Sequence, residues 1–376
     1  MSIRIIVSSI YIFLLFDGCI PTKITNAVLL DPIHGIDSNK VAKNIILLIG
    51  DGMGISQISA AMYMSNQKLH LERFKEIGIH KPQAIDNLII DSASGATAFS
   101  IGRKTNNGYI GIDENHEKYE TILEEASKKG YMTGMVVTST IVHATPAAFA
   151  AHQTSRNSYE AIALDICNSS CNLLIGGGKK YFDRRTTDSL NLSQLLISKG
   201  YVVTDYFEND MRQYQFPEVD KLCYFTADGD PLPFNQGRDQ LAKVSAQSIE
   251  FLHRIKPSNG FFLMIEGSQI DWGGHANETD YVVSEMLDFD RAIGAALAFA
   301  ERDKNTLVIV TGDHETGGLA INPGSRMGSL LTSYSSKDHS ADLIPVFAYG
   351  PGAENFKGIY ENTAIYYKMR KFLFGE

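Results

Sequence analysis

The chain has 376 residues, of which 44% are hydrophobic and 20% are charged, and its formal net charge is −9. This composition is typical of a soluble globular protein, and the length allows one to three domains. The acidic balance and the lack of a Lys/Arg stripe argue against a nucleic-acid-binding surface. A phosphorylated ligand would have to be attracted by local positive charge, such as a bound metal ion.

The first residues resemble a secretory leader. Arg4 provides a short basic segment, and residues 5–16 form an apolar run that is too short for a comfortable membrane span. We predict that residues 1–19 are either a cleaved signal peptide or a lipoprotein leader with lipid on Cys19, and the two interpretations stay open. Residues 20–40 are predicted to be a polar tether. An exported protein is therefore expected, either periplasmic or a membrane-anchored lipoprotein.

Three more cysteines follow the leader. Cys167 and Cys171 are four positions apart, and an oxidising compartment would allow a disulfide between them, which the spacing does not decide. Cys223 is unpaired by count. Because the chain has no Cys-x-x-Cys pair, a thiolate metal site is not expected.

The first strong structural signal is the apolar run 44–50, which ends at Asp51 between two glycines. A strand that is apolar on both faces is typical of a buried parallel sheet. The glycines let the chain turn sharply and leave the Asp51 carboxylate uncovered, although a helix cap explains this stretch equally well.

Small and hydroxylic residues surround Ser92. A helix is predicted over about 93–103, which places Ser92 at an N-terminus whose unpaired N–H groups favour a phosphate. Ser92 could be a nucleophile or an ordinary N-cap. A nucleophilic role would require activation, because a free hydroxyl is hardly ionised at neutral pH.

Polar residues also stand beside the later predicted strands. A helix over 121–129 and a strand over 132–138 are followed by His143, Thr145 and Arg156. Three more apolar runs cover 261–265, 306–310 and 344–349, with a helical period over 283–300. The polar residues beside these runs are Glu266, Asp271, Trp272, His275, Asp313, His314 and His339.

Strands that alternate with helices predict an α/β fold with a largely parallel sheet. Ligands bind beyond the carboxyl ends of the strands in such sheets, so acids after three separate strands predict one shared site. The pattern weakens over 179–242, where we predict an insertion over the site. Residues 41–376 are otherwise expected to form a single domain.

Asp, Glu and His without Cys form a ligand set that suits zinc and magnesium. Asp271 and His275 are four positions apart, so both could face one ion. Two metal ions about 4 Å apart would stabilise the attacking and leaving oxygens of an in-line displacement. A zinc ion beside Ser92 would also supply the activation that a serine nucleophile needs.

Taken together, these residues resemble the alkaline phosphatase family from about residue 44 to the C-terminus, most weakly over 178–242. The resemblance implies a three-layer α/β/α sandwich, commonly homodimeric, that hydrolyses phosphate monoesters of broad type. Each motif alone is weak, whereas the set in this order is highly specific. The matching motifs are Asp91-Ser92-Ala93 with Ala96-Thr97, Thr145-Pro146 with Arg156, Glu266-Gly267-Ser268-Gln269-Ile270-Asp271 with His275, Asp313-His314, and His339.

The resemblance also implies a role for each matching residue. Ser92 would be the nucleophile that becomes phosphoserine, and Arg156 would bind two phosphate oxygens, beside His143 and Trp272. Two zinc ions and one magnesium ion per chain are implied. Their ligands would be Asp271, His275 and His339 for a zinc that activates water, Asp51, Asp313 and His314 for a zinc beside Ser92, and Asp51, Thr145 and Glu266 for magnesium.

Two other functions fit parts of the sequence. A phosphodiesterase of the same superfamily would share the metal ligands, but it typically has Thr as nucleophile and lacks the arginine. A surface lipoprotein that binds phosphate or metal without turnover would have no need of Ser92. A sulfatase would require Pro where this chain has Ser94.

Two positions differ from the enteric bacterial pattern, which has Asp in place of His143 and Lys in place of Trp272. We predict weaker magnesium retention and weaker phosphate inhibition than in that pattern, because a carboxylate ligand and a cation are missing. His143→Asp should strengthen magnesium retention, and Trp272→Lys should strengthen phosphate inhibition. Titrations of activity against both ions test this, and the prediction is wrong if neither variant changes either response.

Overall fold

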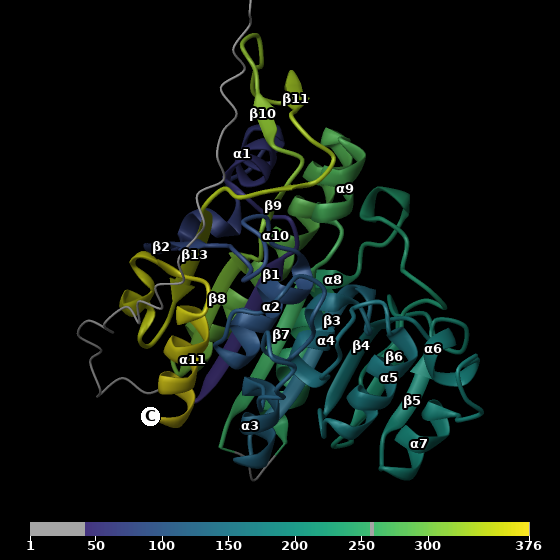
Figure 1. Cartoon of the computed structure of the whole chain (residues 1–376). Coiled ribbons are helices and arrows are strands. Elements are labelled where there is room, and N and C mark those ends of the chain that lie inside the picture. Colours follow the sequence, from purple (N-terminus) through teal and green to yellow (C-terminus); the bar gives the residue numbers. More distant parts are fainter. Residues whose placement is uncertain (1–41, 256–258, 376) are drawn as a thin grey trace, which may run out of the picture. The chain divides into compact units, whose positions relative to one another are not determined.

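The computed structural model describes residues 42–255 and 259–375. The predicted leader and tether lie outside this part of the chain. A ten-stranded sheet forms its centre, with the strand order β14-β2-β13-β8-β1-β7-β3-β4-β6-β5 (Figure 1). Within this sheet β13 runs antiparallel to both of its neighbours, and the other pairings are parallel.

The strands of the large sheet are β1 (Asn44–Gly50), β2 (Glu76–Lys81), β3 (Met132–Thr140), β4 (Leu173–Gly177), β5 (Val202–Asp205), β6 (Leu222–Phe225), β7 (Phe261–Gly267), β8 (Thr306–Gly312), β13 (Ile344–Tyr349) and β14 (Gly358–Glu361). Two small antiparallel pairs are also present. They join β9 (Glu315–Thr316) to β12 (His339–Ser340), and β10 (Leu319–Ile321) to β11 (Thr332–Tyr334).

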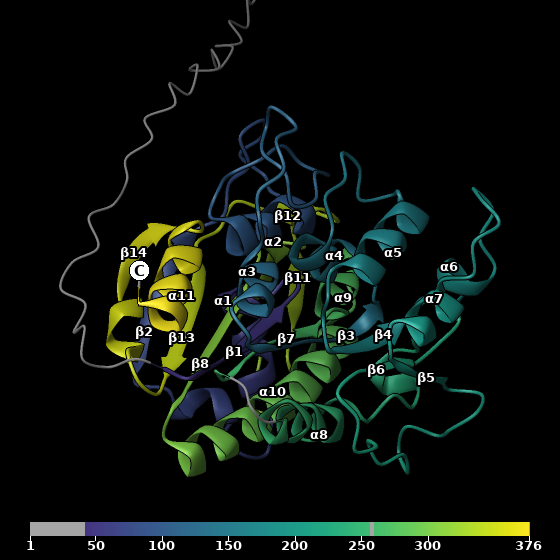
Figure 2. The same ribbon diagram turned by 90° about the horizontal axis from the view of Figure 1, so that it is seen from below.

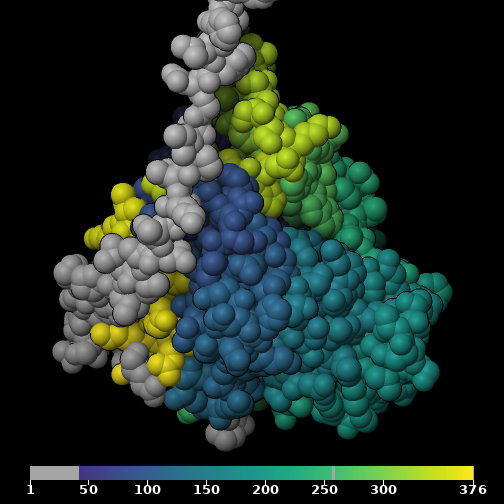
Figure 3. Space-filling view, in the orientation of Figure 1, coloured from purple at the N-terminus to yellow at the C-terminus, as the bar shows by residue number. Residues whose placement is uncertain are grey.

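Helices cover both faces of the sheet, as Figure 2 shows in the view from below. One face carries α2 (Ser92–Ile101), α3 (Ile122–Lys128), α4 (Ala144–Ala150), α5 (Tyr159–Asn168), α6 (Lys180–Asp183), α7 (Leu192–Ser198), α11 (Ala364–Phe374) and η3 (Ala353–Phe356). The other face carries α1 (Ile55–Met64), η1 (His70–Arg73), α8 (Leu241–Arg254) and α10 (Thr279–Asp303). In Figure 3 the side chains of the first layer hide the strands behind them. The predicted three-layer sandwich is confirmed.

Side chains along β1 point alternately to the two faces of the sheet, which explains why helices are needed on both faces. Ile45, Leu47 and Ile49 pack into the core under α2 and α4, and all three are fully buried. Ile46 and Leu48 point the other way, into the core under α8 and α10. Successive side chains of a strand face opposite sides, so a continuous apolar run is stable only when both sides are covered.

The helix α2 is built for close packing and is buried over its whole length. The Asp91 side chain caps its N-terminus by accepting a hydrogen bond from the Ser94 N–H at 3.0 Å. Gly102 ends it in the left-handed conformation, with φ +69°. Because its residues are mostly small, the backbone can approach α4 and the loop after β8, and this places Ser92 at the edge of the sheet.

The segment 179–242 corrects the prediction of an insertion. Its strands β5 and β6 extend the large sheet at one edge, and its helices α6 and α7 pack on one face, so these elements are part of the sandwich and not an insertion. Each of these strands has only four residues, too few for a clear periodic signal. The remainder includes η2 (Phe234–Gln236) and the loop before it.

Cys167, Cys171 and Cys223 are buried free thiols, so the disulfide that the spacing of the first two would allow is not formed in this structure. None of the helices in residues 42–255 and 259–375 combines the length and the apolar character that a membrane span requires.

Gly102→Ala should destabilise the protein more than the same change at Gly200. Both glycines follow a helix in the left-handed region, where a side chain costs about 1–2 kcal/mol. A Cβ at Gly102 would also lie 2.3 Å from the Tyr366 ring, whereas at Gly200 it would meet nothing within 4 Å. Thermal unfolding of the two variants tests this, and equal losses would contradict it.

Candidate active site

Three neighbouring strands end level with one another at one edge of the sheet. Gly50 of β1 pairs with Gly267 of β7 on one side and with Gly312 of β8 on the other. Asp51 and Asp313 are the residues directly after these ends, and α9 (Ile270–Ala276) begins three residues after β7. The expected gathering of acids beyond the carboxyl ends of the strands is therefore present.

Ser92 lies beside these acids at the first turn of α2. Its Oγ is 3.3 Å from His314 Nε2 and 3.4 Å from Asp51 Oδ1, and its side chain is buried. The Ser92 hydroxyl thus faces a histidine and a carboxylate at the N-terminus of a helix. That position suits a nucleophile directed at an anionic group.

Potential metal ligands gather in three overlapping groups, each with its ligand atoms within 4.8 Å of one another. One group has the predicted members Asp51, Asp313 and His314. In the second group, His314 stands with Asp271 and His339, where the predicted third member was His275. In the third group, His143 stands with Asp51 and Glu266, where the predicted third member was Thr145. The three groups are Asp51, Asp313 and His314; Asp271, His314 and His339; and Asp51, His143 and Glu266.

His275 lies next to the second group. Its Nε2 is 3.3 Å from Asp271 Oδ2 and 3.2 Å from His339 Nε2. The Nδ1 atoms of both histidines contact backbone carbonyls, of Lys337 for His275 and, at 2.7 Å, of Ile90 for His339. These carbonyls can accept a hydrogen bond from a protonated Nδ1, so that Nε2 is left without a proton and is free to bind a cation.

Several buried polar atoms of the site have no hydrogen-bond partner among the described residues. They are Asp51 Oδ2, His143 Nδ1, Thr145 Oγ1, Glu266 Oε1 and Asp313 Oδ2. Unpaired buried polar groups are costly and rare in folded proteins. An oxygen-rich set of this kind, with histidine and without cysteine, fits zinc and magnesium.

The pKa values of the carboxyl groups reflect the same crowding. Burial, followed by repulsion from Asp313 and Asp271, raises the pKa of Asp51 well above its ordinary value. Burial likewise raises the pKa of Asp313 to about 8 and that of Glu266 to about 7. The carboxylates would therefore not all be ionised near neutral pH without a counter-charge, which a divalent cation would supply.

Arg156 is held at the site by Asp91, a partnership that the sequence did not predict. Arg156 Nη1 donates to Asp91 Oδ2 at 3.0 Å, and the N–H of Gly108 donates to the same oxygen at 3.0 Å. Burial would raise the pKa of Asp91, but Arg156 and these hydrogen bonds hold it below its ordinary value. The only signal in the sequence was the position of Asp91 beside Ser92.

His143 and Trp272 lie against each other, with ring centroids 6.1 Å apart in an edge-to-face arrangement. His143 Nε2 is also 3.5 Å from Arg156 Nη2. Both predicted substrate-binding residues therefore lie beside the site. His143 additionally faces Asp51 and Glu266, two of the predicted magnesium ligands, as expected at a position where the enteric pattern has Asp.

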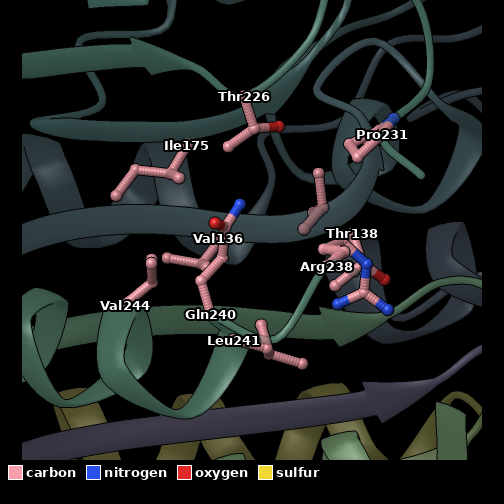
Figure 4. Close-up of a pocket in the computed structure, with 10 residues that line it drawn as sticks. Val136, Thr138, Ile175, Thr226, Pro231, Arg238, Gln240, Leu241 and Val244 are labelled. Carbon is pink, nitrogen blue, oxygen red and sulfur yellow. The ribbon is translucent and has the colours of Figure 1, made fainter. Parts of the chain in front are cut away.

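A small cavity lies away from these residues, between β3, β4, β6 and the start of α8 (Figure 4). Its walls include Val136, Thr138, Ile175, Arg238 and Leu241. None of the predicted site residues lines it, and its volume of about 10 Å³ is room for a single water molecule. We assign it no ligand.

The metal-free chain should lose stability as the pH rises from about 7 to about 9. The pKa values of Asp313, about 8, and His275, about 9, are raised, so the folded state holds protons that the unfolded state has released. His143 and His314 have lowered pKa values and are neutral in both states over this range. The proton that the fully buried Asp313 retains costs up to about 1.4 kcal/mol per pH unit, and the proton on the partly exposed His275 costs less because solvent screens it.

Thermal unfolding of chelator-treated protein across this range measures the effect. Protein loaded with zinc and magnesium is the control and should change much less, because bound cations stabilise the ionised carboxylates. A melting temperature of the metal-free chain that stays constant or rises would contradict the prediction.

Comparison with known proteins agrees with the geometry. The family model described as "Alkaline phosphatase" matches residues 42–333 and 329–374. Alkaline phosphatase 3 of Bacillus subtilis is 39% identical over 86% of this chain and 87% of that protein, and the Escherichia coli alkaline phosphatase is 30% identical over 89% and 86%. The structure of alkaline phosphatase from the Antarctic bacterium TAB5 superimposes with a TM-score of 0.83 and 43% identity, covering 89% of this chain and 98% of that one. The chain therefore belongs to the alkaline phosphatase family and is a phosphatase.

Proposed function

We propose that the chain is an alkaline phosphatase that hydrolyses phosphate monoesters through a phosphoserine on Ser92. The observation that carries the proposal is the position of the Ser92 hydroxyl. It lies at a helix N-terminus, 3.3 Å from His314 and 3.4 Å from Asp51, where three groups of potential metal ligands meet. A binding protein without turnover would not need a buried nucleophile at this point.

The proposed cofactors are two zinc ions and one magnesium ion per chain. The buried atoms of Asp51, Thr145, Glu266 and Asp313 support this, since each residue offers an oxygen with no geometrically acceptable hydrogen bond among the described residues. Two variants of the TAB5 protein, with a histidine replaced by Glu or Asp, hold magnesium in a site named M3. The proposed ligands are Asp271, His275 and His339 for one zinc, Asp51, Asp313 and His314 for the other, and Asp51, Thr145 and Glu266 for magnesium.

When bound, such ions lower the pKa of a hydroxyl or a water and stabilise negative charge on oxygen. Arg156 binds two phosphate oxygens through its planar guanidinium, which Asp91 holds in place. The Ser92 hydroxyl releases its proton, Oγ attacks phosphorus, and the bond to the leaving oxygen breaks as the Oγ–P bond forms, with the leaving oxygen taking up a proton from solvent. Water then attacks phosphorus, the Oγ–P bond breaks, and phosphate and the free Ser92 hydroxyl are regenerated.

The contacts of the site favour monoesters of broad type. Arg156 and the N-terminus of α2 address the phosphate group, and no described residue is assigned to the leaving group. A phosphodiester has one fewer free oxygen for Arg156. We therefore rank the diesterase second and the phosphate- or metal-binding lipoprotein third.

We further propose that the protein is exported, with residues 1–19 removed or with lipid on Cys19, and that it forms a homodimer. The apolar leader supports export, and the family supports the dimer. The mass of the mature protein distinguishes cleavage from lipidation, and light scattering gives its oligomeric state. An unprocessed protein in the cytoplasm would refute export, and a monomer would refute the dimer.

Ser92→Ala should abolish phosphate release from p-nitrophenyl phosphate, with a loss of at least about 1,000-fold. Metal content measured by mass spectrometry should remain at the wild-type level. The matched control is Ser100→Ala, since Ser100 is buried in the same helix and bonds only to the backbone of Thr97. The wild-type rate should rise toward alkaline pH, because an ionised hydroxyl is required.

Three results would contradict this prediction. A metal-loaded wild type that hydrolyses diesters but not monoesters would favour the diesterase. A wild type that binds zinc or phosphate but releases no phosphate from any ester would favour the binding-protein interpretation. An acidic optimum would argue against ionised hydroxyl chemistry.

A further inference from the structure

Thr316 is a buried residue that connects the two groups of proposed zinc ligands. It lies in β9, two residues after His314, and its side chain is fully buried. The Thr316 hydroxyl donates to Asp271 Oδ1 and lies 3.3 Å from His314 Nδ1. In the pairing of β9 with β12, Thr316 also stands opposite His339. One residue therefore adjoins all three members of the group Asp271, His314 and His339.

The direction of these hydrogen bonds follows from which atoms carry a proton. An ionised carboxylate only accepts, so the single proton of the Thr316 hydroxyl is directed to Asp271. The hydroxyl oxygen can then only accept from His314, which places the His314 proton on Nδ1. His314 Nε2 is left without a proton, and this is the atom that lies 3.3 Å from Ser92 Oγ and 3.4 Å from Asp51 Oδ1. The hydroxyl thus selects the histidine tautomer that can bind a cation.

The surroundings of Thr316 prevent its hydroxyl from turning elsewhere. Gln57 Nε2 donates to the Thr316 carbonyl at 2.8 Å and to Glu315 Oε1 at 2.7 Å, which fixes the backbone of β9. Two glycines press against the side chain. A Cβ at Gly52 would lie 2.8 Å from Thr316 Oγ1, and one at Gly274 would lie 2.8 Å from Thr316 Cβ. A β-branched side chain in this space has few rotamers available.

We infer that Thr316 is a positioning residue that orients ligands of both zinc sites through one hydroxyl group. The inference rests on the proposed function, because it assumes that Asp271 and His314 hold metal ions. It adds that the two sites share a hydrogen-bonded partner. Loss of the hydroxyl should therefore weaken both sites together, because Asp271 loses a donor and His314 loses the acceptor that sets its tautomer.

The test compares three variants by their affinity for zinc. Thr316→Val keeps the shape of the side chain and removes the hydroxyl, whereas Thr316→Ser keeps the hydroxyl. The matched control is Thr311→Val, because Thr311 is also fully buried and its hydroxyl bonds only to the carbonyls of Gly312 and Pro345. Metal-free protein is titrated with zinc in competition with a chelating dye.

Thr316→Val should bind zinc about 10- to 100-fold more weakly at both sites, the usual effect of removing a partner of a metal ligand. Thr316→Ser and Thr311→Val should remain within about threefold of wild type, which is less than 1 kcal/mol. Cobalt in place of zinc gives a second readout, since its visible spectrum reports the geometry of the ligands. That spectrum should change in Thr316→Val and not in Thr316→Ser.

Zinc affinity of Thr316→Val equal to that of wild type would overturn the inference, as would an equal loss in Thr311→Val. If Thr316→Val does not fold, Thr316→Ala is the second variant, and wild-type zinc affinity in that variant also overturns it. Failure of the proposed function looks different, because wild type would then bind zinc tightly and release no phosphate from p-nitrophenyl phosphate.

Discussion

Repulsion between buried carboxylates is the constraint on which the site depends. Asp51, Asp313 and Glu266 are brought together because β1, β7 and β8 are parallel and end in register. All three are fully buried, so water cannot screen their charges. Because pairing holds the three strands in register, these side chains cannot move apart without breaking the sheet. A local cation is the simplest group that allows the sheet to end in this way and the carboxylates to be ionised.

The N-terminus of helix α2 lies next to this cluster of carboxylates. Its N-terminus and Arg156 provide the positive charge that a phosphate requires, against a net charge of −9 for the whole chain. Asp91 contributes twice, because it caps α2 through Ser94 and holds Arg156 through its second oxygen. Ser92, the proposed nucleophile, and Arg156, the proposed phosphate ligand, are therefore both positioned by one carboxylate.

Two kinds of feature could be predicted from the sequence: elements with a local apolar pattern, and the meeting of acids that follow the ends of parallel strands. The run 44–50 predicts a doubly covered strand, and Asp51 follows from it directly. The short strands β6 and β5, which end the sheet on one side, have no such signal, and the sequence therefore predicted an insertion there. Polar contacts between residues far apart in the sequence also leave no periodic pattern by which they could be predicted. Asp91 and Arg156 are 65 positions apart, and Thr316 and Asp271 are 45 apart, so only the folded chain shows these partnerships.

The two parts of the domain differ in what holds them together. The sheet is stabilised by two large apolar cores that need no ligand. The elements above it are short, since α9 has seven residues and β9 and β12 have two each. Segments of this length are not stable by themselves and depend on their partners. Because α9 packs mainly on α10, whereas β9 and β12 pair only with each other beside the proposed ligands, cation binding should stabilise β9 and β12 most while the sheet below keeps its structure.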